Sequence, residues 1–459
     1  MLDIFTTDKK ADEITLQLVA EYIERHRTNE LPRLQLLQDY YEGNHSISGR
    51  SKDRGLSNNK LIINHAAYIA DFATGYLLGE PVIYKAPEGA DISPLVKMLK
   101  KADSATQDSD LALDLAVFGR AYDMAYMSSD EKPYPKLAKL SPLCSFVVYD
   151  DTVEQNPVFA VYYYPVYDNR GRIKQYKCSY QTAFVIVDFT LDERLKNPIL
   201  TDEREHYFGA VPINEIYNNG QRRGDFEKVI SLIDAYNLLQ SDRVNDKEQF
   251  VNALLVLKGA TLGDDNEEKT ESYNALKLFN VLELPDGADA GYLIRQFDEN
   301  SVEVLKNSIV SDIHKISGVP DMTDQSFAGN TSGVAMKYKL LGLEQITRVK
   351  QRFFTEGLKY RLMLFSNVAR VQGADISIAD IEIDFRRSLP SNVLEIAQTI
   401  SQLSGLVPTK DLLAQLPFIA DADKALSELE KEKAKSIKEQ QKMFGNTPIV
   451  AGDEDEEAQ

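Results

Sequence analysis

Apolar residues recur at steps of three and four along residues 301–317, which is the spacing of a helix with one buried face. Gly318 and Pro320 follow directly and predict the end of that helix. The next stretch, residues 321–331 (DMTDQSFAGNT), is typical of a loop because Asp, Gly, Asn and Thr favour turns. A second helical pattern without proline covers residues 332–371 and would span roughly 60 Å. We expect this helix, loop and long helix to organise the rest of the molecule.

Two glycines, Gly342 and Gly357, interrupt the long helical pattern. A glycine in a helix interior costs about 1 kcal/mol relative to alanine, so each position predicts local weakness. Gly342 lies nearer the loop, and we predict a helix kink there that relays the position of the loop.

The first half of the chain alternates between amphipathic helices and short strands. Its apolar spacing predicts helices at residues 14–27, 31–41, 64–78, 93–102 and 109–118, with strands at 82–84 and 121–127. Residues 137–188 contain β-branched and aromatic residues in short runs, and Gly171 in DNRGR indicates a hairpin turn. We therefore expect an antiparallel sheet there, which ends in an extended link at residues 208–219.

Residues 225–258 form a second long helical pattern, with Val229, Ile233 and Tyr236 on one apolar stripe. Residues 260–298 then read as a small α/β insert with an acidic opening (DDNEE) and strands at 280–284 and 292–296. The insert separates two helices that can run antiparallel, 225–258 and 301–317. We expect a stalk of two helices with a small head at its tip.

The C-terminal part returns to helices after one strand. Residues 376–385 (ISIADIEIDF) alternate apolar and polar, which predicts a half-buried strand. Helices are predicted at residues 392–404, 409–416 and 422–443, with prolines between them. The acidic tail at 453–459 is expected to be disordered. The whole pattern predicts an α+β chain that is mainly helical.

Composition adds few constraints beyond size. The chain has 459 residues, 43% of them hydrophobic, which favours roughly two to four domains. No run of about 18 apolar residues exists and the first residues lack an apolar signal core, so we expect neither a membrane span nor secretion. Cys144 and Cys178 form no metal or redox motif, and we expect free thiols in a reducing cytoplasm.

The formal net charge of −19 bears on nucleic-acid binding. Tight binders neutralise phosphates with Lys and Arg, so a chain this acidic is not expected to hold DNA or RNA firmly over a wide surface. The chain could still lie next to nucleic acid without binding it tightly.

Candidate catalytic groups are few, and none has the required spacing. His45 and His65 lie near carboxylates but form no metal-binding pattern, and the adjacent pair Asp150 and Asp151 indicates a turn rather than an acid–base pair. Phosphate-binding loops and nucleophile elbows are absent from the sequence. We expect no enzyme, no catalytic or metal site and no cofactor.

A basic cluster stands out in this acidic chain. It lies in the polar stretch GRSKDRGLSNN and consists of Arg50, Lys52, Arg54 and Lys60. Both a solvated loop and a contact with a phosphate or a partner remain open for it.

Several stretches, in this order, resemble the portal proteins of tailed double-stranded DNA bacteriophages. The matching phrases are YYEGNH, NNKLIINHAAYIADFATGYLLGEPV, FGAVPINEIYNNGQRRGDFEKVISLIDAYN, SDRVNDKEQFVNALLVLKG and SGVPDMTDQSFAGNTSGVAMKYKLLGLEQ. They run through most of the chain, and their common order is more specific than any one of them.

The resemblance implies a portal fold with named parts. It assigns a wing to residues 1–224, the stem helices to 225–259 and 300–319, and a clip to 260–299. It assigns the tunnel loop to 320–331, the long helix with a wing strand to 332–390, a crown to 391–445 and an acidic disordered tail to 446–459.

The resemblance also implies a role in the virion. Portal subunits form a ring, typically of twelve copies, at one capsid vertex, after assembly in the host cytoplasm. The ring is the channel for packaging and ejection of double-stranded DNA, which it binds weakly. Expected partners are the terminase large subunit, head-completion or adaptor proteins, and the major capsid and scaffolding proteins.

Two groups of residues are expected to carry this role. The tunnel loop would touch DNA through a stretch without Lys or Arg: Asp321, Met322, Thr323, Asp324, Gln325, Ser326, Phe327, Gly329, Asn330 and Thr331. The clip would dock partners through Asp264, Asp265, Glu267 and Glu268.

Two other classes of protein stay open, a head–tail adaptor or other structural ring component and a nuclease-type processing enzyme.

Overall fold

The computed structural model describes residues 4–53, 57–87, 90–250, 254–259, 261–279, 286–293, 299–322, 333–374, 376–378, 380–387, 393–413, 415–416, 419 and 422–444. Two compact units divide the chain: residues 1–328 with 338–388, and residues 329–337 with 389–459. The elements are α+β and mainly helical, as predicted. Within the described ranges, no helix has a stretch long and apolar enough to cross a membrane.

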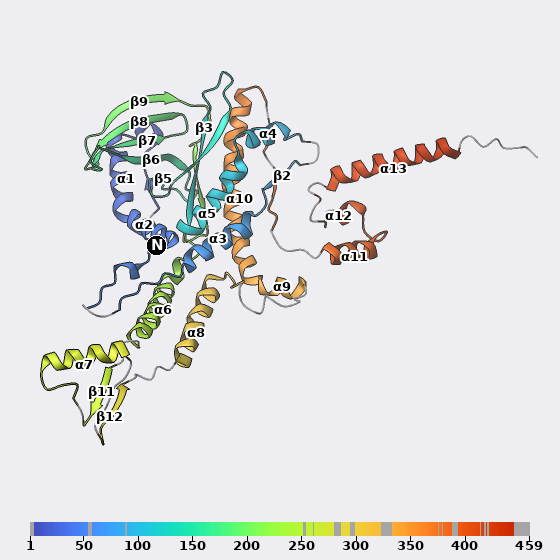
Figure 1. The fold of residues 1–459 in the computed structure, drawn as a ribbon. Helices are drawn as coiled ribbons and strands as arrows, with labels where there is room; N and C mark the ends of the chain where they lie inside the picture. Colours follow the sequence, from blue (N-terminus) through green and yellow to red (C-terminus); the bar gives the residue numbers. More distant parts are fainter. Residues whose placement is uncertain are drawn as a thin grey trace, which may run out of the picture. The chain divides into compact units, whose positions relative to one another are not determined.

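The predicted antiparallel sheet is present as six strands in the first unit (Figure 1). Its order is β1 (Thr6–Thr7), β5 (Ser145–Asp150), β6 (Pro157–Tyr167), β7 (Ile173–Gln181), β8 (Val185–Asp192) and β9 (Ile199–Glu205), and only the β1–β5 pair is parallel. Gly171, with φ +74°, lies in the turn between β6 and β7, which confirms the hairpin. The sequence analysis missed β9, an edge strand whose seven residues are all exposed.

Helix α1 (Leu16–Asn29) covers one face of this sheet. Thr15 caps its first turn by accepting a hydrogen bond from the backbone N–H of Leu18 at 3.2 Å. Its buried residues Val19 and Ile23 join a core cluster with Phe146 and Phe159 of the sheet. Short 3-10 turns, η1 (Ala11–Glu13) and η2 (Ser46–Gly49), flank the N-terminal helices.

A second sheet has three antiparallel strands in the order β10 (Ile213–Tyr217), β3 (Arg120–Met127) and β4 (Pro135–Leu140). The predicted extended link at 208–219 therefore contains a paired strand. The helices of this region are α2 (Leu31–Glu42), α3 (His65–Leu78), α4 (Ser93–Lys101) and α5 (Ser104–Phe118), close to the predicted bounds.

The predicted long helix is divided in two. Helix α9 (Gly333–Lys339) and helix α10 (Leu341–Val371) are separated at Leu340, so a single helix over 332–371 was wrong. Further along α10, Gly357 allows a close approach to β10: a Cβ atom there would lie 2.6 Å from Cγ1 of Ile216.

The strand predicted at 376–385 is much shorter in the structure. Among the described residues of this stretch, only β13 (Glu382–Asp384) forms a ladder, antiparallel to β2 (Ile83–Lys85). Asp380 adopts a left-handed backbone with φ +63°, which interrupts an extended chain. Ile376 and Ile381 are buried in the core beside α10, so their burial, rather than a long strand, explains part of the alternation.

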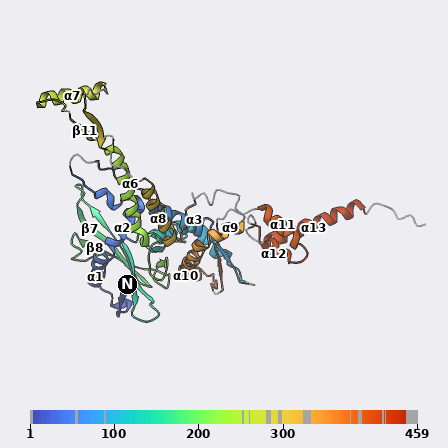
Figure 2. The ribbon, with the colours of Figure 1, turned by 90° about the horizontal axis from the view of Figure 1, so that it is seen from below.

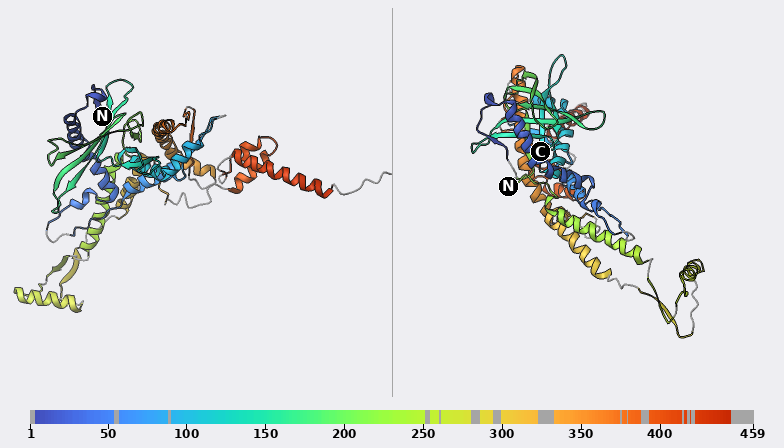
Figure 3. Two further views of the ribbon diagram at one scale, coloured as in Figure 1. Left: turned by 90° about the horizontal axis from the view of Figure 1, so that it is seen from above. Right: turned by 90° about the vertical axis from the view of Figure 1, so that its left-hand side faces the viewer.

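The two-helix arm is formed by α6 (Ile230–Phe250), preceded by η3 (Glu227–Val229), and by α8 (Glu299–Ser317), which lie side by side (Figure 3). The helix predicted to run to residue 258 was wrong, because Leu254–Lys258 form strand β11 and pair with β12 (Asp289–Leu293). A short apolar run such as LLVLK fits a helix or a strand equally well, and the pairing decides it. Helix α7 (Asn266–Phe279) completes the insert; the strand predicted at 280–284 and residues 294–296 lie outside the described residues.

The second unit contains α11 (Val393–Leu403), α12 (Thr409–Leu413) and α13 (Ala422–Phe444), gathered together in Figure 2. These bounds agree closely with the three predicted helices. Helix α12 packs on α13, and beyond residue 430 the described positions of α13 are exposed.

Candidate functional site

A tyrosine of α3 holds the entrance of the predicted tunnel loop. Tyr68 donates its hydroxyl hydrogen to the carbonyl oxygen of Pro320 at 2.9 Å and accepts a hydrogen bond from the backbone N–H of Met322 at 3.0 Å. One side chain therefore satisfies two backbone groups of the loop entrance. Asp321 and Met322 lie at this anchor; the other predicted loop residues, Thr323, Asp324, Gln325, Ser326, Phe327, Gly329, Asn330 and Thr331, lie outside the described residues.

Helix α8 ends just before this anchor in a turn that requires glycine. Gly318 has φ +73°, a left-handed conformation that side chains disfavour. A Cβ atom on Gly318 would lie 2.2 Å from Cδ1 of Ile346 on α10. His314 donates its Nδ1 hydrogen to the carbonyl oxygen of Val319 at 2.9 Å. The end of α8 is therefore packed directly against the start of α10.

Aromatic rings fill the space beneath the entrance. The ring of His314 meets those of His65 and Tyr68 edge-to-face, with centroids 5.8 Å and 5.7 Å apart. Burial, followed by the nearby His314, lowers the pKa of His65 to about 4. His65 is therefore neutral at neutral pH and packs as an apolar ring.

The same helix α3 also holds the chain beyond the loop. Tyr76 donates its hydroxyl hydrogen to Oε2 of Glu344 at 2.9 Å, and Arg387 and Arg348 bind the same carboxylate at 3.1 Å and 2.9 Å. Burial opposes ionisation of Glu344, but the hydrogen bonds from its partners outweigh burial and lower its pKa. Tyr68 thus fixes the entrance of the loop, and Tyr76 fixes α10 after its exit.

Buried ion pairs fix α10 at two further levels. Lys350 binds Asp225 at 2.5 Å, and Arg361 binds Asp123 at 2.5 Å and Asp108 at 2.6 Å. All five side chains are at least nine-tenths buried. Sliding α10 would separate charges that no water could then solvate, so these pairs hold its register.

The interruption of the helix lies at Leu340, close before Gly342 and outside the part that the ion pairs hold. Gly342 itself is the second residue of α10, and its neighbourhood includes the backbone of Gly318. The kink at Gly342 remains a prediction.

The predicted clip residues begin helix α7. Asp265 accepts hydrogen bonds from the backbone N–H groups of Glu267 and Glu268 at 2.9 and 2.8 Å, and Glu268 accepts one from that of Asp264 at 3.0 Å. This is a reciprocal N-terminal cap. All four side chains are exposed, but two of them also stabilise the helix start, so a docking test must preserve the cap.

Partly exposed ion pairs link the two helices of the arm. Arg243 of α6 binds Glu303 of α8 at 3.0 Å, and Lys247 binds Glu299 at 3.3 Å. Their side chains are between 26% and 63% exposed.

The described residues of the basic cluster make their contacts with other residues of the same chain. Arg50 and Lys52 both reach Oδ1 of Asp242 on α6, at 2.8 and 3.0 Å. Lys60 donates to the carbonyl oxygen of Ser48 at 2.6 Å, and Arg54 lies outside the described residues. The described cations of this cluster therefore fasten the 46–60 segment to itself and to the arm.

Histidines and acidic pairs have structural roles here. Nδ1 of His45 accepts a hydrogen bond from Asn237 at 2.7 Å, and Nε2 donates its hydrogen to the carbonyl oxygen of Tyr40 at 3.0 Å. Asp150 caps a turn by accepting from Thr152 and Asn156. Over the described part of the chain, no group of three His, Cys, Asp or Glu side chains is placed to hold a metal ion.

Sequence reasoning missed the residues that hold the loop. Tyr68, Phe72 and Tyr76 recur at a spacing of four, which places aromatic groups along one face of α3. That spacing was visible, but their partners lie more than 250 residues away in the chain, and only the fold brings them together.

An arm of two helices with an α/β insert between them in the chain is the arrangement that the resemblance implies for the stem and clip of a portal subunit. The family model described as "Phage portal protein, SPP1 Gp6-like" matches residues 20–439. The chain belongs to this portal protein family, which confirms the resemblance found in the sequence.

Individual relatives carry the same description. The portal protein of Clostridium phage phiCD119 is 22% identical over 397 residues, which cover 80% of this chain and 84% of that protein. The portal protein of Bacillus phage SPP1 is 23% identical over 379 residues, which cover 79% of this chain and 74% of that protein. Among solved structures, a chain from the neck of an empty GTA (gene transfer agent) particle has a TM-score of 0.47 and 15% identity, covering 77% of this chain and 90% of that chain.

Proposed function

We propose that this chain forms a ring of twelve copies at one vertex of a phage head and that double-stranded DNA passes through its centre. The observation that carries the proposal is the portal family match over residues 20–439. In the ring, residues 225–259 and 300–319 would be the stem, 260–299 the clip and 391–445 the crown. Strand β11, at the end of the first stem segment, would belong to the clip instead, because it pairs with β12. The role is structural, as expected for this family.

Negative-stain images and native mass measurement of the purified chain test the ring. We expect particles with a central hole and a mass of about twelve subunits. Monomers or dimers alone, across salt and protein concentration and in the presence of scaffolding protein, would sink the proposal.

The tunnel loop is proposed to touch the passing DNA. Its stretch DMTDQSFAGNT has no Lys or Arg, so it cannot clamp phosphates by charge, and the chain as a whole is acidic. Changing Gln325 and Asn330 to Lys would add a ring of positive charges to the channel, which would bind the phosphates of the DNA. We expect less DNA protected in heads while rings form normally. Gln325→Ser with Asn330→Ser is the matched control. Normal packaging by the lysine variant would make the loop a passive connector.

The clip is proposed to dock the terminase large subunit and head-completion proteins, with capsid and scaffolding proteins contacting other parts of the ring. Asp264→Ser with Glu267→Ser removes two exposed charges and keeps the cap made by Asp265 and Glu268. We expect weaker capture of terminase by intact rings. Asp265→Asn, which keeps an N-cap oxygen, is the control for helix integrity. Unchanged capture by the double variant would place docking elsewhere.

A further inference from the structure

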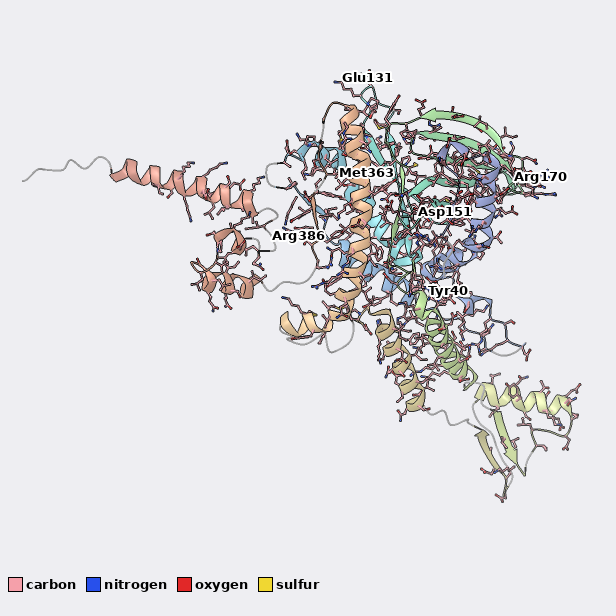
Figure 4. The ribbon with its side chains drawn as sticks, turned by 180° about the vertical axis from the view of Figure 1, so that it is seen from behind. Tyr40, Glu131, Asp151, Arg170, Met363 and Arg386 are labelled. Atoms are coloured by element: carbon pink, nitrogen blue, oxygen red, sulfur yellow. The ribbon has the colours of Figure 1, made fainter. Side chains whose placement is uncertain are left out.

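A segment between α2 and α3 lies along helix α6 of the arm. Its described residues are 46–53 and 57–63, and both of its ends belong to the body, by which we mean the first unit without the arm and the insert. Figure 4 labels Tyr40 of α2 beside the body end of α6, where its hydroxyl lies 2.7 Å from both carboxylate oxygens of Asp234. Ser46 donates to the same carboxylate at 2.8 Å. The segment therefore starts at the base of the arm.

The outward half of the segment is held by charge. Arg50 and Lys52 both donate to Oδ1 of Asp242, about two turns farther along α6, at 2.8 and 3.0 Å. Burial raises the pKa of Asp242, but the hydrogen bonds from Lys52 and Arg50 outweigh burial and lower the pKa below its ordinary value. The carboxylate therefore stays ionised at neutral pH and keeps both cations.

The return half is held by a regular series of hydrogen bonds from backbone N–H groups to side-chain oxygens. The pairs are Asn59 with Asn245 at 2.6 Å, Leu61 with Ser241 at 2.9 Å and Ile63 with Asn237 at 2.9 Å. Four residues of an α-helix rise about 6 Å and two residues of an extended chain rise about 6.6 Å, so the two spacings match. The return half therefore runs antiparallel to α6 as an extended chain.

This series defines one position of the segment on α6. In an extended chain, alternate residues face opposite sides, so a shift by one residue would turn the three N–H groups away from the helix. The next matching position lies a full turn of α6 away. The segment therefore cannot shift along the helix in small steps.

The sequence of α6 fits this partner better than an apolar one. Asn237, Ser241 and Asn245 recur every four residues, which places them on one face of the helix, and each is at most 1% exposed. An apolar neighbour would leave these polar groups buried without partners, which is costly. On the side of α8, the ion pairs of Arg243 and Lys247 are partly exposed and lose little when they separate.

We propose that the 46–63 segment is a brace that fixes the direction in which the arm leaves the body, with Asn237, Ser241 and Asn245 as its positioning residues. Both ends of the brace continue into α2 and α3, so the arm cannot turn at its base unless these hydrogen bonds break. In the proposed ring, the brace would hold the clip of every copy at the same level. That consequence rests on the proposed function, whereas the brace itself is a property of one copy.

Proline substitution tests the brace. Leu61→Pro with Ile63→Pro removes two N–H donors, whereas the control Leu61→Ala with Ile63→Ala keeps both donors and removes more of the apolar side chains. Nitroxide labels on unnatural amino acids at the exposed positions Glu21 of α1 and Asn307 of α8 measure the distance from body to arm. Labelled chain is diluted with unlabelled chain, so that only distances within one copy are measured.

We expect one narrow distance in the wild-type chain and in the alanine variant, and a distribution about twice as broad in the proline variant, because only the donors hold the register. An equally narrow distance in the proline variant would overturn the brace. A broader distance in the alanine variant than in the proline variant would also overturn it, since apolar packing would then hold the segment.

A second variant breaks the same hydrogen bonds from the side of α6. Ser241→Ala with Asn245→Ala removes two acceptors, and alanine favours the helix itself, so a weaker α6 cannot explain the result. Hydrogen exchange of the amides at 237–248 should become about fivefold faster, while protected amides of α10 show that the variant is folded. Adding the proline pair should change little more, because both variants remove shared contacts.

Unchanged exchange and an unchanged distance in the α6 variant would overturn the proposal even if the proline variant failed to fold. A wild-type chain that forms no rings would instead remove the proposed function and leave the brace in place. The two failures are therefore distinguishable.

Discussion

Helix α10 and the α6–α8 arm belong to the same unit, but their ion pairs lie in opposite environments. Lys350 and Arg361 of α10 bind carboxylates that are at least nine-tenths buried, whereas Arg243 and Lys247 of the arm bind exposed ones. A buried pair cannot exchange its partner for water, so it holds one geometry; an exposed pair loses little when it separates. The body around α10 is therefore self-sufficient, and the arm depends on other contacts.

Apolar burial follows the same division. Ile233 and Ile313 are fully buried where the arm joins the body, but Val304 and Leu305 of α8 are 70% and 51% exposed farther along. An arm that buries its apolar residues only at its base gains from neighbours in an assembly. The comparison predicts large effects of substitutions in the body and small ones in the isolated arm.

The largest effect is expected from Arg361→Met. Removing the guanidinium leaves Asp108 and Asp123 buried without their partner, which should lower the free energy of unfolding by about 3–5 kcal/mol. Chemical unfolding of the chain measures it. Lys359→Met, a change at an exposed site on the same helix, is the control, and adding Asp108→Asn and Asp123→Asn should restore part of the loss. Equal stability of Arg361→Met and Lys359→Met would contradict the role of the buried pair.

The body should also respond to acid through His26. Burial, then the nearby positive charge of Arg120, lowers the pKa of His26 to about 3, below its ordinary value of 6.5. The unfolded chain then binds a proton that the folded chain does not, so stability is full above pH 6.5 and falls as the pH drops toward 3. The contribution lost between pH 7 and pH 4 is about 3 kcal/mol. His26→Phe should flatten this part of the stability profile; an unchanged slope would show that other groups cause it.

A smaller effect is expected where the body meets the loop. Gly318→Ala should cost about 2 kcal/mol, part from its left-handed backbone and part from contact with Ile346, whose terminal methyl group can move aside. Gly171→Ala has the same backbone conformation and open space around it, so about 1 kcal/mol is expected there. Thermal unfolding of both variants isolates the packing cost, and identical values would argue against the close approach of α8 and α10.

The smallest effect is expected in the arm. Arg243→Gln with Lys247→Gln should leave the Tm of the free subunit unchanged within error, because both pairs are exposed to solvent and salt. Circular dichroism at low and high salt measures this. A clear loss of helix in the free subunit would show that the arm depends on its own ion pairs and would break the comparison with α10.

Local patterns predicted most helices and the Gly171 hairpin, because apolar spacing and turn residues act over a few positions. They failed where distant pairing decides. Leu254–Lys258 form a strand because they pair with β12. The long helix is interrupted at Leu340, whereas the sequence predicted a kink at Gly342. The start of the loop at Asp321 was predicted, but the roles of Tyr68 and Tyr76 were not. Their hydrogen-bond partners lie more than 250 residues away, and no local pattern indicates them.

Strand β9 has a consequence for the chain before it assembles. A fully exposed edge strand with Ile199 and Leu200 presents free backbone groups to any other extended chain in a crowded cell. Asp202, Glu203, Arg204 and Glu205 occupy the rest of the strand, and stacking two copies would bring like charges together. We therefore expect the charged half of β9 to disfavour edge-to-edge pairing between new subunits before they assemble.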